Sequence, residues 1–278
     1  MQNSDFLGDG HASTPVVSSS AGWPACDYES VTWQTPGNQH TSRRQQLKAR
    51  GPYQACVPAF IAGVHPVLPS ELVAELEDAA TAIARFDFEI GGFVAPFDAI
   101  LMRSESASSS EVENLTAGAK QLALASIGEK NSRNAQIVVD NVSAMRAALA
   151  LGEAPTGSAI IEMHRALLGR SQPEICGAWR SKAVWVRGHS PHTAEYVGPE
   201  SARINELIAD LEIFMQRTDL PILAQVALAH AQFETIHPFE DGNGRTGHVA
   251  TESSARAPVV PASAGCRNGG NESGGWPG

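Results

Sequence analysis

Hydrophobic residues recur at helical spacing through most of the chain between residues 57 and 236. After Pro69, apolar side chains follow the i, i+3, i+4 pattern of a helix that begins at Ser70 and packs along one face. The positions of that face are Leu72, Val73, Leu76, Ala79, Ala80 and Ile83. The same spacing predicts further helices at about 110–125, 131–151, 160–168, 200–217 and 221–236. The last of these is the most apolar, so we expect it at the centre of a helical bundle.

The period changes at residues 181–188, which read SKAVWVRG. Val184, Trp185 and Val186 indicate a short strand, and a polar turn at 188–194 leads to Tyr196–Val197. Two short apolar runs on either side of a polar turn predict a small β-hairpin. The predicted fold class is therefore all-α, a helical bundle with one hairpin.

The two ends of the chain lack this periodicity. Residues 1–50 are rich in Ser, Thr, Gln, Asn, Gly and Pro, which predicts a disordered arm that Trp23 or Trp33 anchors. From Val249 to Gly278 there is no Leu, Ile, Met or Phe. We expect a helix to continue for two turns up to Pro258, followed by a disordered tail.

Charge and composition exclude several classes of protein. The formal net charge is −10 and the pI is near 5.3, which argues against general nucleic-acid binding. No apolar run reaches the length that spans a bilayer, and the N-terminus lacks the pattern of a secretory signal. The four cysteines are scattered, without a CxxC pair. We therefore expect a cytoplasmic protein with no membrane or nucleic-acid partner.

Residues 237–248, HPFEDGNGRTGH, concentrate side chains that can carry out chemistry. Pro238 makes it hard for the last helix to continue past His237. His237 is then at a helix C-terminus, where the helix dipole favours the protonated form. Its unperturbed pKa, near 6.5, suits a general base. By itself, a histidine in this place is more often only a helix-end residue.

The residues after His237 have the properties of an anion site. A turn at Gly242-Asn243-Gly244 that leads into a helix exposes backbone N–H groups to a phosphate. Asp241 offers a hard oxygen ligand for Mg²⁺, and Arg245 can offset phosphate charge. Each element alone has an ordinary explanation, as a turn or a surface charge. Together they predict phosphoryl or nucleotidyl transfer.

The stretch HPFEDGNGR resembles the signature of the Fic family, HPFx[DE]GNGRxxR, and matches every defined position except the last. GAWRSKAVWVRG and the later AEYVGPE are similar to the substrate-binding flap of that family. Residues 57–125 are similar to the helical region often found N-terminal to Fic domains. The resemblance covers about residues 55–248 and implies a Fic-type helical bundle with a small β-hairpin flap.

The resemblance implies transfer of AMP from Mg-ATP to a hydroxyl group of a target protein. Whether the chain is also its own target is left open. His237 would deprotonate the hydroxyl, Phe239 would anchor the loop, and Asp241 would bind Mg²⁺. The nucleotide phosphates would contact Gly242, Asn243, Gly244, Arg245 and the residue at the final position, His248. The target segment would add as a strand to the flap, at Val184, Trp185, Val186, Tyr196 and Val197. The sequence leaves open whether the chain forms a homodimer.

The implied organisation has four parts. These are a disordered N-terminal arm (1–50), an N-terminal helical region with a candidate inhibitory helix (51–125), a Fic domain that is incomplete at its C-terminal end (126–256), and a disordered tail (257–278). The composition after residue 248 motivates the hypothesis that a frameshift or gene decay replaced the closing helices. An alternative reading frame after Gly247 that encodes an apolar helix would support a frameshift.

The segment SSSEVEN (108–114) contains Ser109-x-x-x-Glu113-Asn114, which is similar to the inhibitory motif [ST]xxxE[GN] of autoinhibited Fic proteins. In that family the glutamate pairs with the final arginine of the signature. The same segment also reads as a helix capping box, with Ser110 as the N-cap and Glu113 at the third helical position. The resemblance favours the inhibitory interpretation, and the residues alone leave both open.

His248 stands where the signature has its last arginine. A neutral imidazole cannot make the bidentate contact that arginine makes with a phosphate or a carboxylate. Losing such a contact costs roughly 1.5–3 kcal/mol, on the order of tenfold to a hundredfold in rate or affinity. Two alternatives therefore accompany the transferase: a non-catalytic remnant that binds nucleotide or a partner, and an enzyme that removes AMP with Glu113 activating water.

Overall fold

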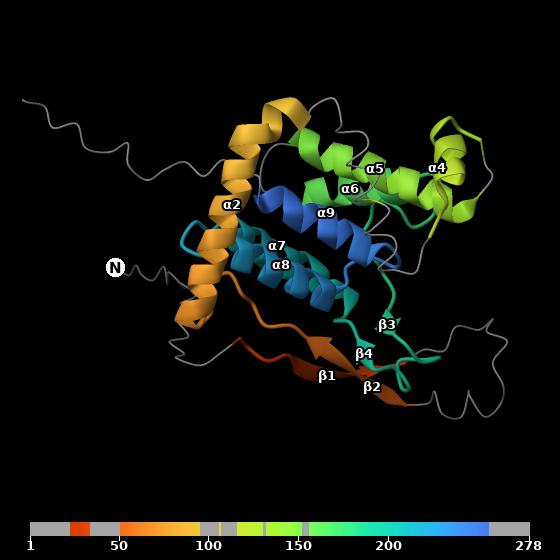
Figure 1. The fold of residues 1–278 in the computed structure, drawn as a ribbon. Helices are drawn as coiled ribbons and strands as arrows, with labels where there is room; N and C mark the ends of the chain where they lie inside the picture. The colour runs from red at the N-terminus through yellow and green to blue at the C-terminus, as the bar shows by residue number, and fades with distance from the viewer. Residues whose placement is uncertain are drawn as a thin grey trace, which may run out of the picture.

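The computed structural model describes residues 23–33, 51–94, 106, 116–129, 132–151 and 156–255 (Figure 1). Two antiparallel hairpins accompany a group of helices. The strands are β1 (Asp27–Thr32), β2 (Pro52–Val57), β3 (Trp185–Val186) and β4 (Tyr196–Val197). The helices are α2 (Ser70–Val94), α4 (Ala119–Ser126), α5 (Arg133–Leu151), α6 (Gly157–Leu168), η2 (Ser201–Arg203), α7 (Ile204–Met215), α8 (Ile222–Ile236) and α9 (Asn243–Ala255). The predicted fold class, a mostly helical protein with a small hairpin, is confirmed.

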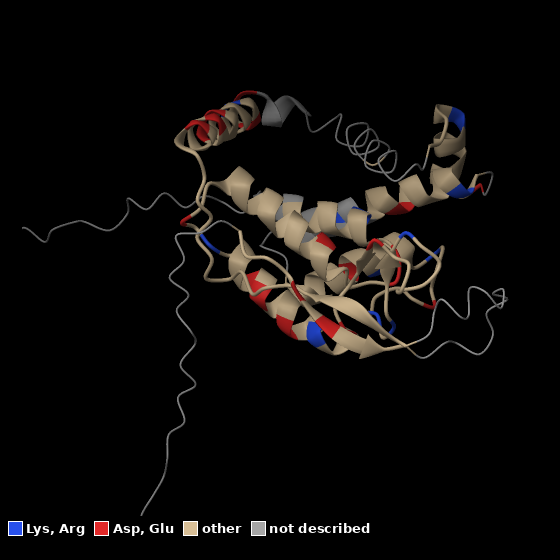
Figure 2. Ribbon diagram, turned by 90° about the horizontal axis from the view of Figure 1, so that it is seen from below, with Lys and Arg blue, Asp and Glu red and all other residues tan. Residues whose placement is uncertain are grey.

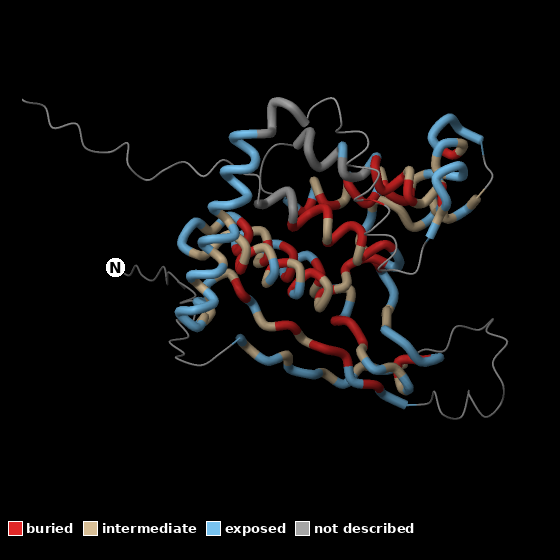
Figure 3. Tube along the Cα trace, in the orientation of Figure 1, coloured by how far each residue is buried: buried red, intermediate tan, exposed pale blue. Residues whose placement is uncertain are grey.

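The core lies between α6, α7, α8 and α9, where the buried segments gather (Figure 3). Its largest fully buried side chains include the rings of Phe214, Phe233 and Phe239. α9 approaches α8 closely at Gly247, where a Cβ atom would lie 2.6 Å from the Phe233 ring. A side chain at residue 247 would push α9 away from α8, so this glycine is needed for the close packing.

Most helices lie where the hydrophobic period predicts them. The predictions for 131–151, 160–168 and 221–236 correspond to α5, α6 and α8, and 200–217 corresponds to η2 and α7. The helix expected at 110–125 is described only as α4, from Ala119, because 107–115 lie outside the described residues. After the turn, α9 starts at Asn243 and continues to Ala255, as far as the described residues extend.

The interior face of α8 is more polar than its sequence suggests. Ile222, Leu223, Val226 and Leu228 are only partly buried, whereas Gln225 and Gln232 are buried. Gln225 donates to the carbonyl oxygens of Phe214 and Arg217, at 2.7 and 2.9 Å. Gln232 donates to a carbonyl oxygen of the segment after β2. A buried amide is tolerated where backbone acceptors satisfy it, which hydrophobicity alone does not reveal.

α2 begins at the predicted Ser70, but its expected packing face is wrong. Leu72 is 39% exposed and Ile83 is 59% exposed. Figure 3 shows nearly all of the described part of the helix as exposed. Figure 2 shows acidic residues along it, which agrees with six acidic residues and one basic residue in its sequence. The pattern predicted the helix correctly, but nothing within the described residues covers most of its apolar face.

Residues 27–32 form strand β1, which corrects the prediction of a disordered arm over this stretch. β1 pairs antiparallel with β2, with Asp27 opposite Val57. Glu29 of β1 accepts two hydrogen bonds from Arg203, at 3.0 and 2.9 Å. The strand is short and largely exposed, and both stabilising partners are far away in sequence, so its own composition does not predict it. The remainder of the predicted arm lies outside the described residues.

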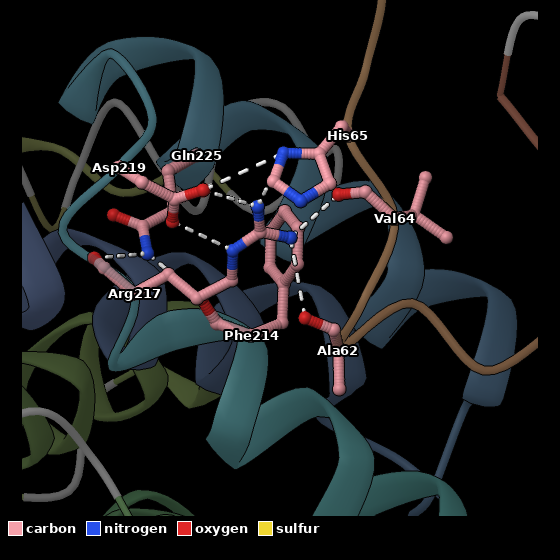
Figure 4. A network of polar contacts seen from close by, with 7 residues as sticks. All are labelled: Ala62, Val64, His65, Phe214, Arg217, Asp219 and Gln225. Atoms are coloured by element: carbon pink, nitrogen blue, oxygen red, sulfur yellow. Dashed lines mark hydrogen bonds and ion pairs between the residues drawn. The ribbon is translucent and has the colours of Figure 1, made fainter. Parts of the chain in front are cut away.

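The segment between β2 and α2 is fixed by Arg217, at the turn between α7 and α8 (Figure 4). The Arg217 guanidinium donates to the carbonyl oxygens of Ala62 (3.2 Å) and Val64 (2.5 Å). It also makes two hydrogen bonds to Asp219, which hold the pKa of that carboxyl at about 2. This network attaches the N-terminal hairpin and α2 to the helical core. Among the described helices, none has both the length and the apolar character needed to cross a bilayer.

Candidate active site

His237 lies immediately after α8, in a left-handed conformation with φ 49° and ψ 61°. Its backbone N–H still donates to the Phe233 carbonyl oxygen at 2.9 Å, which closes the helix. The ring atom Nδ1 lies 3.3 Å from the Glu234 carbonyl oxygen. Because a carbonyl oxygen can only accept, Nδ1 carries the proton and Nε2 keeps its lone pair. The local geometry therefore leaves Nε2 as the basic atom of the ring.

Burial lowers the pKa of His237 below its ordinary value. The Glu234 carbonyl opposes this shift, and the positive charge of Arg180 adds to it. The net shift of the pKa is therefore opposite to the one expected from the helix dipole, because desolvation is the largest cause. With a side chain that is 24% exposed, His237 is a neutral base near the protein surface.

The turn after His237 is closed by the side chain of Asn243. Its Oδ1 accepts from the Phe239 N–H at 2.8 Å, and its Nδ2 donates to the Phe239 carbonyl at 2.9 Å. Asn243 and Phe239 are both buried. The Asn243 side chain is therefore used to shape the turn, and what it can offer a phosphate is its backbone N–H at the start of α9.

Gly242 has a φ of 78°, in the region that side chains rarely adopt. A Cβ atom there would lie 3.3 Å from the side chains of Leu167 and Leu168. The turn therefore needs a glycine both for its backbone conformation and for its close approach to α6. It leads directly into α9, whose first N–H groups have no partner within the helix. Gly244 and the buried Arg245 belong to this first turn, so the residues predicted to contact phosphates lie together at the start of a helix, where an anion is favoured.

Asp241 precedes the turn, and its side chain is 48% exposed. Its Oδ1 accepts from the Gly242 N–H at 2.7 Å, and its Oδ2 accepts from Gln172. Arg245 lies 3.9 Å from Oδ1. Among the described residues there is no group of three or more His, Cys, Asp and Glu side chains that could hold a metal. One exposed carboxylate fits a Mg²⁺ ion that binds mainly through substrate phosphates, and does not fit a metal site made by protein ligands alone.

His164 on α6 supports the turn and was missed by the sequence analysis. Its Nδ1 accepts from the Gly177 N–H at 3.0 Å, so Nε2 carries the proton that it donates to the Asp241 carbonyl, also at 3.0 Å. The ring stacks on Phe239 with 3.7 Å between centroids. Burial lowers the pKa of His164, which agrees with a neutral ring. From the sequence, a histidine on the apolar face of a helix is indistinguishable from an ordinary core residue. The residues around His164 give no other indication of its role.

Arg180 was also missed, although it lies within the stretch GAWRSKAVWVRG. It is buried and donates to the carbonyl oxygens of His237 (2.8 Å), Lys182 (2.9 Å) and Pro199 (2.7 Å). Its own N–H donates to the Pro238 carbonyl at 2.9 Å. Burial lowers its pKa to about 10, so it stays charged at neutral pH. One arginine therefore joins the segments at both ends of the β3–β4 hairpin to the residue proposed as the base.

The β3–β4 hairpin lies where the sequence predicts it, with Trp185 opposite Val197 and Val186 opposite Tyr196. Val184 precedes β3, and its carbonyl accepts from the Gly198 N–H. The Tyr196 hydroxyl donates to the carbonyl of Thr235, in the last turn of α8. The predicted flap residues are thus brought together beside the end of α8.

The N-terminal hairpin supports the β3–β4 hairpin from one side. Trp33 makes edge-to-face contacts with Tyr53 and Trp185, with centroids 6.0 and 5.7 Å apart. His192, in the turn between β3 and β4, contacts the Gly51 carbonyl through Nε2 at 2.9 Å. The spacing of apolar residues predicted the β3–β4 hairpin and did not predict the N-terminal hairpin that supports it.

The remaining predicted site residues are His248, on α9, and three residues of the candidate inhibitory motif. His248 is on α9, partly buried, with its ring 6.3 Å from that of His230 on α8. Ser109, Glu113 and Asn114, the candidate inhibitory residues, lie outside the described residues.

The structure thus brings three features together in one helical domain: a histidine at the end of α8, a glycine turn that starts α9, and the β3–β4 hairpin beside them. Residues 155–254 match the model of the Fic/DOC family. The chain therefore contains a Fic/DOC family domain at these residues, and the predicted family is confirmed.

Known relatives agree with this assignment. The chain is 38% identical over 92 residues to the protein adenylyltransferase Fic of Nematostella vectensis, which covers 32% of this chain and 20% of that protein. The chain thus spans about a fifth of this curated relative. Among solved structures, a Fic family protein from Desulfovibrio desulfuricans G20 superposes with a TM-score of 0.57 and 26% identity, over 69% of this chain and 59% of the other. Fic-1 of C. elegans has the same fold, with a TM-score of 0.51 and 19% identity over 67% and 58%.

Proposed function

We propose that this chain is a protein adenylyltransferase, which transfers AMP from Mg-ATP to a hydroxyl side chain of a target protein. The observation that carries the proposal is the neutral His237, with the lone pair on Nε2, at the start of the glycine turn. The Fic/DOC domain and the printed name of the Nematostella relative support the same chemistry. ATP is the expected nucleotide substrate.

In the proposed reaction the target hydroxyl oxygen attacks the α-phosphorus of ATP. Its proton passes to Nε2 of His237 as the new oxygen–phosphorus bond forms. The bond between the α-phosphorus and the bridging oxygen breaks, and pyrophosphate leaves with that electron pair. A positioned base of this kind contributes on the order of 10²–10⁴-fold to a rate.

The first turn of α9 would hold the phosphates. The backbone N–H groups of Asn243 and Gly244 and the positive end of the helix favour an anion there. Arg245, at the same turn, adds a fixed positive charge. Asp241 would hold Mg²⁺ together with the phosphates, and the cation would offset the negative charge of the departing pyrophosphate.

The β3–β4 hairpin would bind the target segment. It lies beside the end of α8, through Tyr196 and Thr235, and Val186 is exposed at 40%. A strand added to the hairpin would be held by backbone hydrogen bonds, which tolerate many side-chain sequences. The target hydroxyl would then reach His237 from the hairpin side.

Two further features would limit the rate. His248 stands in place of the final arginine of the signature and cannot make a bidentate contact with a phosphate. Glu113 belongs to the inhibitory motif that the resemblance implies, with Ser109 and Asn114. We therefore propose weak, restrained activity in the unaltered chain.

Incubation with Mg²⁺ and ATP labelled at the α-phosphate tests the proposal. The original chain, Glu113→Gly and His248→Arg are compared, each with and without His237→Ala. We expect the strongest self-labelling in Glu113→Gly and a gain in His248→Arg. Labelling that persists in the His237→Ala background would contradict the role of the base. Absence of labelling in every variant would instead favour a remnant that binds without catalysing.

A further inference from the structure

Gln172 makes a contact with Asp241 that the proposed reaction does not use. Its side-chain Nε2 donates to Asp241 Oδ2, although the two residues are 69 positions apart. The backbone N–H of Gln172 donates to the Leu168 carbonyl at 2.8 Å, so the residue is fixed against the last turn of α6. The amide therefore reaches Asp241 from a fixed backbone position.

Asp241 is held from two other directions. Its Oδ1 accepts from the Gly242 N–H at 2.7 Å, and its backbone carbonyl accepts from His164. With one donor on each carboxylate oxygen, the orientation of the carboxylate is fixed before any ligand arrives. A carboxylate has about four lone-pair sites, so both oxygens retain acceptor capacity.

This arrangement matters for a cation because Mg²⁺ demands near-ideal geometry and binds here through few protein ligands. Groups that hydrogen-bond to a metal-binding carboxylate set its orientation, and their loss typically lowers metal affinity 10–100-fold. Gln172 is suited to this task because its neutral amide fixes Oδ2 without adding a positive charge to that of Arg245, which lies 3.9 Å from Oδ1. An arginine or lysine in its place would compete with the cation for the negative charge of Asp241.

We propose that Gln172 is a positioning residue that holds the Asp241 carboxylate in the orientation required by the divalent cation that accompanies the nucleotide. This proposal rests on the function proposed above. The opposite role, a latch that occupies Asp241 and keeps the cation out, predicts the opposite change in affinity. Cation binding can therefore decide between the two roles without any measurement of transfer.

The test uses the full chain with Mn²⁺ as a probe and α,β-methylene-ATP, which cannot be split at the bond that the reaction breaks. Electron paramagnetic resonance measures free Mn²⁺ for the unaltered chain, Gln172→Ala, Asp241→Ala and Ser171→Ala, an exposed neighbour that serves as the matched control. We expect Gln172→Ala to weaken Mn²⁺ binding about 10–100-fold. Binding of the analogue without metal should stay unchanged, because Gln172 acts only on the carboxylate. Ser171→Ala should bind Mn²⁺ as the unaltered chain does.

Each other outcome has a defined meaning. Unchanged or tighter Mn²⁺ binding in Gln172→Ala, with a loss in Asp241→Ala, overturns the positioning role and leaves the metal assignment intact. A parallel loss of metal-free analogue binding in Gln172→Ala shows a general structural defect, which also overturns it. If Asp241→Ala binds Mn²⁺ normally, or if the unaltered chain binds none, the metal site of the proposed function fails and this inference fails with it.

Discussion

The two halves of the candidate site are held in place by different forces. The motif loop, residues 237–245, is fixed by hydrogen bonds between its backbone and the side chains of Asn243, His164 and Arg180. The β3–β4 hairpin has two residues in each strand and, besides the hydrogen bonds at its ends, packs against the aromatic rings of Trp33 and Tyr53. Directional bonds define one geometry for chemistry, whereas ring packing supports an edge without fixing what binds to it. The difference suits the two roles proposed above, a loop that positions reacting groups and a hairpin that binds target segments of varied sequence.

The Arg180 side chain bonds to both halves of the site, so its removal should lower the free energy of unfolding the most. Arg180→Leu leaves the carbonyl oxygens of His237, Lys182 and Pro199 without their donors. We expect a loss of at least about 3 kcal/mol in the free energy of unfolding, measured by urea titration. Arg146→Leu, at an exposed position on α5, is the control and should change stability by less than about 0.5 kcal/mol. Equal effects of the two substitutions would mean that Arg180 does not join the halves.

The two hydrogen bonds between Asn243 and Phe239, which clamp the motif loop, should make the next largest contribution to stability. Asn243→Ala removes both bonds to Phe239 and leaves a buried N–H and a buried carbonyl unpaired. We expect a loss of about 2 kcal/mol in the free energy of unfolding, and about half of that for Asn243→Asp, which keeps the acceptor. Asn134→Ala, whose amide makes an exposed bond, is the comparison and should cost much less. A cost for Asn243→Ala as small as that of Asn134→Ala would argue against a clamp.

The protonation of His237 should set the acid limit of activity. Burial lowers its pKa below 6.5, and the base works only when it is neutral. Labelling should therefore be fully developed at neutral pH and fall about tenfold per pH unit only below the lowered pKa. A pH–rate profile of the Glu113→Gly variant measures this limit. A midpoint at or above 6.5 would show that desolvation does not control the ring.

The smallest effect is expected in the hairpin. His192→Ala removes the bond to the Gly51 carbonyl and two edge contacts, to Trp33 and Tyr53. We expect a loss of about 1 kcal/mol in stability, together with faster hydrogen exchange at residues 184–197. His189→Ala, at an exposed position in the same turn, is the matched control. If exchange in the motif loop rises as much as in the hairpin, the two halves are not held independently.

Much of this architecture could be predicted from residue spacing. The helical periods located α5 to α8, and the change of period located β3 and β4, because both signals are local. β1 was missed because its polar, exposed strand is stabilised by β2 and by Arg203, both distant in sequence. The buried face assigned to α2 was wrong because a helical period shows that a face exists, and not that another element covers it.

By itself, the sequence determined the parts of the candidate site that lie within nine residues: the histidine, the carboxylate, the glycine turn and the arginine in the first turn of α9. These depend on local backbone geometry, which residue types and spacing specify. Only the tertiary structure decided that His237 is neutral, that the Asn243 side chain closes the turn, and that Arg180, His164 and Gln172 hold the loop. Arg180, His164 and Gln172 lie 57 to 77 residues from the loop residues that they contact, and they become neighbours only when the helices pack. Asn243 and Phe239 are four residues apart, but residue types alone do not specify that their side-chain to backbone bonds form.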